Sequence, residues 1–333
     1  MKIRYPKSMM ILSLLLILFI LLNGMAYLHA FAMLHFVSQE KRTPSIESLS
    51  FWQKAEILLT GINIPKPVNF ATPNDIGLSY ETHRFKVNSE VELEAWYIPH
   101  AQSKGIILMF HGYVAPKSVL LHIARIFHDM GYQTFIVDFR GSGGSNQMTT
   151  SIGYYEGDDV SKTVEYVQTR LARMPIILYG QSMGGVAILR GIYANGTQPD
   201  AIIIESVFGN LLETIKNRFK LMGLPAWPAA HLLVFWGSVQ RGFSGFKHNP
   251  LEYATRVDCP VMMLHGTEDR RATLATAEAI FSNLRGQKRI ERFEGLGHEP
   301  YLRRHSEQWK RSVYEFLKGL AGNYSENGLP RND

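Results

Sequence analysis

One serine stands among small residues in a stretch that is otherwise apolar. The segment ILYGQSMGGVAIL, residues 177–189, places Ser182 between Gly180 and the pair Gly184 and Gly185. Glycine destabilises the interior of helices and strands, so three glycines here indicate a special requirement of the backbone. The residues before Ser182 are typical of a buried strand and those after it of a helix. The pattern predicts a G-x-S-x-G strand-to-helix turn, which presents a serine hydroxyl at the edge of a sheet.

A serine hydroxyl becomes a useful nucleophile only beside a base that an acid holds in place. The strand-like segment VMMLHG is followed by Asp269, and the segment KRIERF is followed by a glycine-rich loop that contains His298. The chain order Ser, Asp, His is the order expected when the nucleophile lies on such a turn. All three residues follow predicted strands, where open α/β sheets carry their chemistry. Glu268 is the alternative acid, and the position in the motif favours Asp269.

Two backbone amides are candidates for stabilising an oxyanion. The loop HGYVAP follows the strand-like segment GIILMF, and in this architecture that loop supplies one amide while the residue after the nucleophile supplies the other. These positions are Tyr113 and Met183. The identity of either side chain matters little, because the donor is the main chain.

No motif predicts a metal or a cofactor. The single cysteine, Cys259, allows neither an internal disulfide nor a cysteine-based metal site, and HEPYL at His298 is not the H-E-x-x-H zinc motif. The segment 137–147, VDFRGSGGSNQ, lacks the spacing of a dinucleotide site, so we interpret it as a tight turn in which Arg140 packs locally. The net charge is +6, but no basic run with interleaved aromatics follows the N-terminus, which argues against nucleic-acid binding.

The elements that position these residues alternate in type along the chain. Two strand-like segments, THRFKV and VELEAWYIP, are followed by five short apolar runs, at 105–110, 133–138, 175–180, 201–206 and 260–266. Helical segments are expected between them, near 117–130, 158–172, 184–194 and 273–285. Runs that are apolar on both faces suit parallel strands covered by helices on both sides. The alternation predicts an α/β domain over residues 80–320.

One interval breaks this alternation. Roughly 50 residues separate ESVFGN from CPVMMLHG, with several aromatic residues and no clear strand. Structureless loops of that length are uncommon. We therefore expect residues 207–250 to form a helical cap over the sheet, with an ordinary connecting helix and a long loop as the alternative.

The N-terminus carries a long apolar run. Residues 9–22 are apolar except for Ser13, three basic residues precede them, and a weaker run continues to Val37. A membrane span needs about 20 apolar residues, so we expect residues 1–37 to be a retained signal anchor. Ala30-Phe31-Ala32 has the A-x-A form of a cleavage site and leaves a cleaved signal peptide as the alternative. The basic flank predicts that the main domain lies outside the cytoplasm.

The segments on either side of the α/β domain are expected to be simpler. Residues 38–79 are predicted to be a linker with one helix, which Ser50 and Gln53 begin as a capping box. That helix is interpreted as packing on its own domain, and lying on the membrane surface is the alternative. Residues 321–333 are predicted to be a disordered tail.

Five motifs together resemble the α/β-hydrolase superfamily of serine hydrolases. They are HGY (111–113), DFRGSGGS (138–145), GQSMGG (180–185), HGTEDRRA (265–272) and GLGH (295–298). The resemblance implies an eight-stranded, mostly parallel sheet flanked by helices, with a small helical cap, and an acyl-enzyme mechanism without a cofactor. Within the superfamily the chain is most similar to membrane-anchored α/β-hydrolase-domain proteins and to monoacylglycerol-lipase or serine-aminopeptidase-like hydrolases. It departs from many relatives after the acid, where Arg270, Arg271 and Ala272 replace a small apolar residue and a proline.

The expected function is hydrolysis of an ester or thioester, and the cap and anchor suggest an acyl or lipid-like small-molecule substrate. In this mechanism Ser182 attacks the carbonyl, His298 accepts its proton and later activates water, and Asp269 orients the imidazole. An amidase or peptidase is the alternative, favoured by an acidic cap residue that pairs with a substrate's amino terminus, for which Glu213 is the candidate. A non-catalytic binding protein of the same fold is the rival from another class. Nothing in the sequence predicts the oligomeric state.

Overall fold

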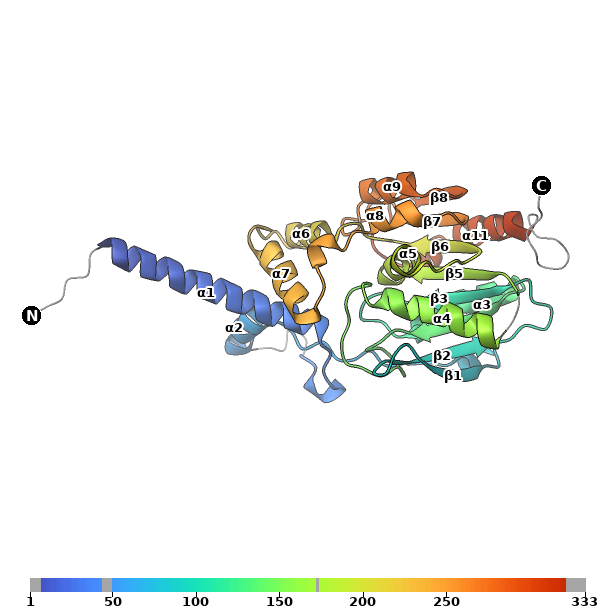
Figure 1. Ribbon diagram of the computed structural model, residues 1–333, viewed down its shortest axis with the longest axis horizontal. Coiled ribbons are helices and arrows are strands. Elements are labelled where there is room, and N and C mark those ends of the chain that lie inside the picture. The colour runs from blue at the N-terminus through green and yellow to red at the C-terminus, as the bar shows by residue number, and fades with distance from the viewer. Residues whose placement is uncertain (1–6, 44–49, 172–173, 322–333) are drawn as a thin grey trace, which may run out of the picture.

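The protein folds around one eight-stranded sheet (Figure 1). The computed structural model describes residues 7–43, 50–171 and 174–321, so of the predicted tail only Ala321 is described, as the end of a helix. The strand order is β1-β2-β4-β3-β5-β6-β7-β8. The strands are β1 (Glu81–Lys86), β2 (Glu92–Ile98), β3 (Ile106–Phe110), β4 (Gln133–Asp138), β5 (Ile176–Gln181), β6 (Ala201–Glu205), β7 (Val261–Gly266) and β8 (Lys288–Phe293). Strand β2 pairs antiparallel with β1 and β4, and the remaining neighbours pair parallel, which confirms the predicted sheet.

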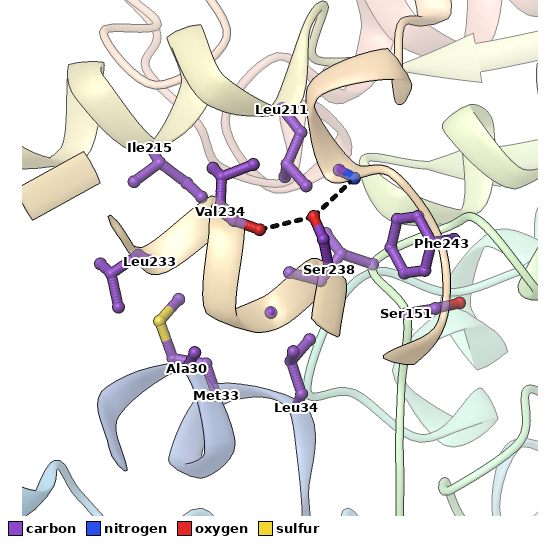
Figure 2. Close-up of a pocket in the computed structure, with 13 residues that line it drawn as sticks. Ala30, Met33, Leu34, Ser151, Leu211, Ile215, Leu233, Val234, Ser238 and Phe243 are labelled. Carbon is purple, nitrogen blue, oxygen red and sulfur yellow. Dashed lines mark hydrogen bonds between the residues drawn. The ribbon is translucent and has the colours of Figure 1, made fainter. Parts of the chain in front are cut away.

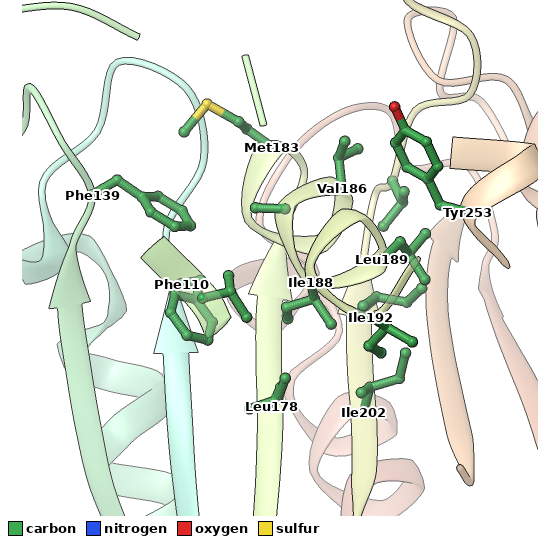
Figure 3. Close-up of a cluster of buried hydrophobic side chains, with 14 of the residues drawn as sticks. Phe110, Phe139, Leu178, Met183, Val186, Ile188, Leu189, Ile192, Ile202 and Tyr253 are labelled. Carbon is green, nitrogen blue, oxygen red and sulfur yellow. The ribbon is translucent and has the colours of Figure 1, made fainter. Parts of the chain in front are cut away.

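Helices cover both faces of this sheet. One face carries α3 (Leu121–Asp129) and α11 (Ser306–Ala321), and the other carries α4 (Glu156–Arg170), α5 (Met183–Asn195), α8 (Pro250–Tyr253) and α9 (Leu274–Asn283). Alternate residues of one strand enter different clusters, as Leu108 and Phe110 do on one face and Met109 on the other. Figure 3 shows the cluster beneath α5. The central strands are buried on both sides, which is why they are uniformly apolar in sequence.

Helix α11 was not expected from the sequence. Its buried side chains Trp309, Val313, Leu317 and Leu320 recur every three or four residues, which is the helical period. They pack on the face that also carries α3. The sequence therefore contains the helical period of this element, in the segment between the predicted His298 loop and the tail.

Two helices occupy the interval that was predicted to be a cap. Helix α6 (Leu211–Leu221) follows β6, and α7 (Ala229–Arg241) leads towards α8. Both lie beyond the sheet, on the side of the N-terminal helix (Figure 1). Asn210 begins α6 by accepting hydrogen bonds from the amides of Leu212 and Glu213.

Helix α1 (Lys7–Leu34) is the one helix in the described part of the chain that is long and apolar enough to cross a membrane. Its first half is exposed, but Ala26, Ala30 and Leu34 are buried at intervals of four residues. This stripe faces α7, where the indole of Trp236 donates to the Asn23 side chain at 3.1 Å. The C-terminal end of α1 is therefore part of the folded domain.

Helix α2 (Phe51–Thr60) begins with the predicted capping box, because the amide of Gln53 donates to Ser50 Oγ and the amide of Ser50 donates to Gln53 Oε1. None of its residues is buried, and Phe51 and Trp52 are 75% and 78% exposed. It lies beside α1 rather than on the sheet (Figure 1). Its observed packing is therefore against α1, and packing on the α/β domain and lying on a membrane surface both stay predictions.

The glycine-rich segment after β4 forms a turn around buried ion pairs. Lys117 is fully buried and its ammonium contacts Asp138 and, at 2.9 Å, Glu94. The amide of Gly144 donates to the same Asp138 carboxylate at 2.9 Å. Arg140 packs locally, as expected, with its guanidinium on Asp159. Breaking a pair of this kind leaves an uncompensated buried charge, which is strongly destabilising.

A pH effect on stability follows from His248, which is fully buried. Its Nε2 donates to the Ile152 carbonyl at 3.0 Å, and its Nδ1 lies 3.0 Å from the Tyr253 hydroxyl. Burial lowers the pKa of His248 from 6.5 to about 4. Below pH 6.5 the unfolded chain therefore binds a proton that the folded chain does not, and stability falls with pH down to about 4.

We expect this residue to remove about 2 kcal/mol of unfolding free energy between pH 7.5 and pH 5. Urea unfolding in detergent at the two pH values measures the effect. The variant His248→Asn lacks the titration and should lose correspondingly less stability over the same interval. Equal losses in the two proteins would show that His248 does not titrate in this way.

Candidate active site

Ser182 lies on a strained turn between β5 and α5. Its backbone has φ 48° and ψ −111°, values that a residue other than glycine rarely adopts. A Cβ at Gly180 would lie 2.6 Å from the backbone carbon of Gly184, and a Cβ at Gly184 would lie 2.3 Å from the Phe110 carbonyl oxygen. The glycines of the motif therefore let strand and helix approach closely enough to hold the serine in this conformation.

The imidazole of His298 lies between the serine and an acid. Its Nε2 is 3.1 Å from Ser182 Oγ, and its Nδ1 is 2.6 Å from Asp269 Oδ2. His298 comes from the loop after β8 and Asp269 from the loop after β7. Glu268, the alternative acid, is exposed, and the hydrogen bond to the imidazole is made by Asp269. The structure thus brings together the three residues that the sequence selected.

Asp269 is held in its charged form although it is 3% exposed. Its Oδ1 accepts the amides of Arg271 and Ala272 at 2.8 and 2.9 Å. Burial alone would raise the pKa of Asp269, but the hydrogen bond and charge of His298, with these two amides, lower it below its usual value. The loop that departs from the pattern of many relatives therefore still turns tightly around the acid.

The two predicted oxyanion residues both lie near Ser182. Met183 is the first residue of α5, whose first-turn amides have no partner within the helix. Tyr113 follows Gly112, where an added Cβ would be 3.8 Å from the Cβ of Ser182. Tyr113 and Ser182 line the same pocket. The positive end of α5 also favours negative charge here.

A buried polar network beneath the site was not predicted. The carbonyl of Glu205, at the end of β6, accepts the amide of Ser182 at 2.7 Å. Its carboxylate accepts from the Tyr179 hydroxyl at 2.8 Å and the Trp309 indole at 3.2 Å, and burial raises the pKa of this carboxyl group. A glutamate directly after four apolar strand residues was the signal that could have revealed it.

Tyr301 links the histidine loop to the same network. Its hydroxyl accepts from Ser206 Oγ and from the amide of Gly266, both at 2.7 Å. Because Tyr301 lies three residues after His298, these bonds fix that loop to the ends of β6 and β7.

Ser182 and His298 line a pocket with about 490 Å³ of empty space, part of which is open to solvent. Its walls include the cap residues Phe208 and Ile215 and, from α1, Met33. The contribution of α1 was not foreseen, because nothing in the sequence relates residue 33 to the catalytic motifs.

Two guanidinium groups line this pocket. Arg218 comes from α6 and is half-buried, and Arg271 comes from the loop after Asp269. Neither has an ion-pair partner among the described residues. Burial lowers the pKa of Arg218, and the positive charge of Arg271 lowers it further. Glu213, the predicted acidic cap residue, is instead exposed and paired with Lys216 at 2.8 Å.

No group of three or more metal-binding side chains occurs in the described ranges. Cys259 is half-buried, and burial raises the pKa of its thiol to about 12. A thiol with that pKa is almost entirely protonated near neutral pH and is a poor nucleophile.

Comparisons with known proteins show which families the chain is similar to. The model of the family "Serine aminopeptidase, S33" matches residues 101–232. The protein YqkD of Bacillus subtilis is 25% identical over 234 residues, which is 69% of this chain and 76% of YqkD. The lysophosphatidylserine lipase ABHD12 of Danio rerio is 25% identical over 239 residues, 64% of this chain and 61% of the relative. The chain thus spans about three-fifths of the length of that lipase.

Solved structures share the fold. The Pyrococcus furiosus esterase Pf2001 superposes with a TM-score of 0.63 at 22% identity, over 77% of this chain and 99% of the esterase. Mouse α/β-hydrolase domain-containing protein 10 gives 0.52 at 16% identity, over 72% and 99%. The chain is thus similar in sequence and in fold to the serine hydrolases of the α/β-hydrolase superfamily. Its relatives include lipases and esterases, in agreement with the predicted enzyme class.

The close approach at Gly184 gives a testable result. We expect Gly184→Ala to lower the melting temperature by several degrees, because its Cβ would meet backbone atoms that cannot move aside. Gly319→Ala is the matched control, since nothing lies within 4 Å of its added Cβ. The control variant should be as stable as the wild type or slightly more stable, because glycine destabilises the interior of a helix relative to alanine. An equal melting temperature for the two variants would contradict this account of the turn.

Proposed function

We propose that this protein is a membrane-anchored serine hydrolase that cleaves a carboxylic ester or thioester of an acyl-bearing small molecule. The observation that carries the proposal is the chain of contacts from Ser182 Oγ through the His298 imidazole to Asp269, at 3.1 and 2.6 Å. The strained turn presents the hydroxyl to the pocket that Ser182 and His298 line. The mechanism follows from these positions.

The carboxylate of Asp269 holds the Nδ1–H tautomer of His298, which leaves Nε2 free to accept a proton. As Ser182 Oγ attacks the substrate carbonyl, its proton passes to Nε2, and the amides of Tyr113 and Met183 stabilise the negative oxygen. The intermediate collapses, and the departing alcohol or thiol takes the proton from His298. Water then attacks the acyl-enzyme with His298 as base, which releases the acid and restores Ser182.

The two arginines support an anionic ester as the substrate. Arg218 and Arg271 line the pocket without an acidic partner among the described residues, and they would attract a phosphate or carboxylate near the scissile bond. The ABHD12 relatives are named as lysophosphatidylserine lipases, whose substrate is an anionic single-chain lipid. We therefore propose an anionic lysolipid as the substrate class. A peptidase that binds a free amino terminus fits less well, because two cations would repel an ammonium group.

Helix α1 supports membrane anchoring by its length and composition. The basic residues that precede it in sequence favour a cytoplasmic N-terminus, which places the hydrolase domain outside the cytoplasm. This orientation is part of the proposal, and the labelling experiment below tests it together with the nucleophile.

A fluorophosphonate probe tests the nucleophile. Ser182 Oγ attacks phosphorus, fluoride leaves, and the hydroxyl proton passes to His298, so the wild type should become labelled and Ser182→Ala should not. Ester hydrolysis by the variant should fall by several orders of magnitude, roughly 10⁶-fold in comparable triads. An impermeant probe should label intact cells as strongly as lysates. If the impermeant probe labels lysates but not intact cells, the proposed orientation is overturned. If neither the fluorophosphonate probe nor its impermeant form labels a folded wild type, the proposed triad is overturned.

Substitutions at two neighbouring carboxylates distinguish Asp269, the proposed acid, from Glu268, which should have no role in catalysis. Asp269→Asn should reduce kcat by roughly 10⁴-fold, because the amide favours the wrong imidazole tautomer. Glu268→Gln is the matched control and should retain wild-type activity, since Glu268 is exposed and does not contact His298. Similar activities of the two variants would contradict the role proposed for Asp269.

Substitution of the arginines tests the charge of the substrate. Charged hydrogen bonds contribute about 1.5–3 kcal/mol, so Arg218→Gln or Arg271→Gln should lower the ratio of kcat/KM for a lysophosphatidylserine to that for its neutral monoacylglycerol counterpart by tenfold or more. Lys220→Gln, on the same helix as Arg218, and Arg270→Gln, beside Arg271, are matched controls that should preserve the ratio. Equal losses of kcat/KM for the lysophosphatidylserine and for the monoacylglycerol would indicate that the arginines only maintain the shape of the pocket.

A further inference from the structure

A second cavity lies between the end of α1 and the cap (Figure 2). Its empty space amounts to about 410 Å³, part of which is open to solvent. Ala30, Met33 and Leu34 of α1 form one wall, and Leu233 and Val234 of α7 lie across from them. The two walls come from segments about 200 residues apart in sequence, so the cavity exists only because α1 packs on the cap.

The lining of this cavity offers almost nothing to a polar ligand. Its two hydroxyl groups are already engaged. Ser238 Oγ donates to the Val234 carbonyl at 2.6 Å and accepts the amide of Gly245 at 2.8 Å. Ser151 Oγ donates to the Glu156 carboxylate. The remaining lining is almost entirely apolar, and a cavity of that kind favours hydrocarbon over water.

The cavity adjoins the catalytic pocket. Met33, Ile152, Leu211 and Ile215 line both. The catalytic pocket has the serine, the histidine and two arginines in its walls, whereas the cavity beside α1 has none of these. The two adjacent pockets therefore differ in character: the one that Ser182 lines carries polar and charged groups, and the one beside α1 is apolar.

Three hydrogen bonds, at Asn23, Tyr27 and Met33, hold α1 against the rest of the protein. The Tyr113 hydroxyl, from the predicted oxyanion loop, donates to the Met33 carbonyl at 2.6 Å. From α7, Gln240 donates to the Tyr27 carbonyl at 2.8 Å and Trp236 to Asn23 at 3.1 Å. A helix that served only as a tether would need none of these contacts.

We propose that the cavity between α1 and α7 binds the acyl chain of the ester that Ser182 cleaves, so that the anchor helix forms one wall of the substrate site. The inference rests on the proposed function of Ser182. The ligand is an unbranched hydrocarbon chain that enters beside the helix that runs into the membrane. The site requires that α1 remain in the mature protein, because cleavage after Ala32 would remove Ala30 and the helix that supports Met33.

Cross-linking on the full-length protein in detergent or bilayers tests the location of the chain. The probe is a hexadecyl fluorophosphonate with a photoreactive diazirine at the far end of the alkyl chain. It first modifies Ser182, and irradiation then marks whatever the chain end contacts. We expect cross-links on the C-terminal half of α1 and on α7.

The outcomes separate the two proposals. Modification of Ser182 with cross-links confined to other surfaces, such as the loops around Ala115 and Pro300 at the other opening, overturns the acyl site alone. No modification of Ser182 in a folded protein overturns the proposed function, and the acyl site with it.

A pair of substitutions on α7 gives an independent test. Leu233→Trp fills the cavity, so kcat/KM for a p-nitrophenyl hexadecanoate relative to the butanoate should fall by tenfold or more. Val239→Trp is the matched control, because Val239 is 56% exposed on the same helix and does not line the cavity. Its ratio should stay within twofold of the wild type. Should Leu233→Trp fold poorly, Ala30→Leu fills the cavity from α1 instead. An unchanged ratio in a folded, cavity-filled variant overturns the acyl site.

Discussion

The active-site geometry depends on a close contact between β5 and α5 that leaves no room for side chains. Gly180 and Gly184 let the first turn of the helix contact the strand and its neighbour, and Ser182 is held between them at φ 48°. A conformation of this kind costs of order 1–3 kcal/mol and persists only where the surroundings enforce it. Here the enforcement comes from the buried cluster beneath α5 and from the bond between the Ser182 amide and the Glu205 carbonyl.

The rest of the site is organised around the ends of the parallel strands. Asp269 follows β7, His298 follows β8, and Tyr301 ties the histidine loop back to β6 and β7. The polar groups of this network are buried yet satisfied by one another, and such networks hold a single arrangement because every alternative leaves a buried group unpaired. The imidazole is thus positioned by packing beneath it as well as by its two direct partners.

The N-terminal helix joins an exposed apolar segment to the part of the molecule that carries the candidate active site. Its exposed half is apolar, and its other end packs on α7 and contacts the loop of Tyr113. An amphiphilic ester that lies partly in a bilayer would meet an apolar cavity beside this helix and two guanidinium groups near the serine. The same helix would then hold the enzyme at its substrate's location and shape the site that receives it.

The sequence by itself determined the strand-to-helix turn, the order of the three candidate residues and most of the sheet. These features depend on local backbone preference and on apolar periodicity, both of which are readable within a few consecutive residues. Helix α11 and Glu205 had local signals that were missed. By contrast, only the tertiary structure decided that Asp269 rather than Glu268 meets His298, that Arg218 and Arg271 share a pocket, and that Met33 forms part of its wall. Those contacts join segments distant in sequence, and they follow from how helices pack on the sheet and on one another, which no local pattern records.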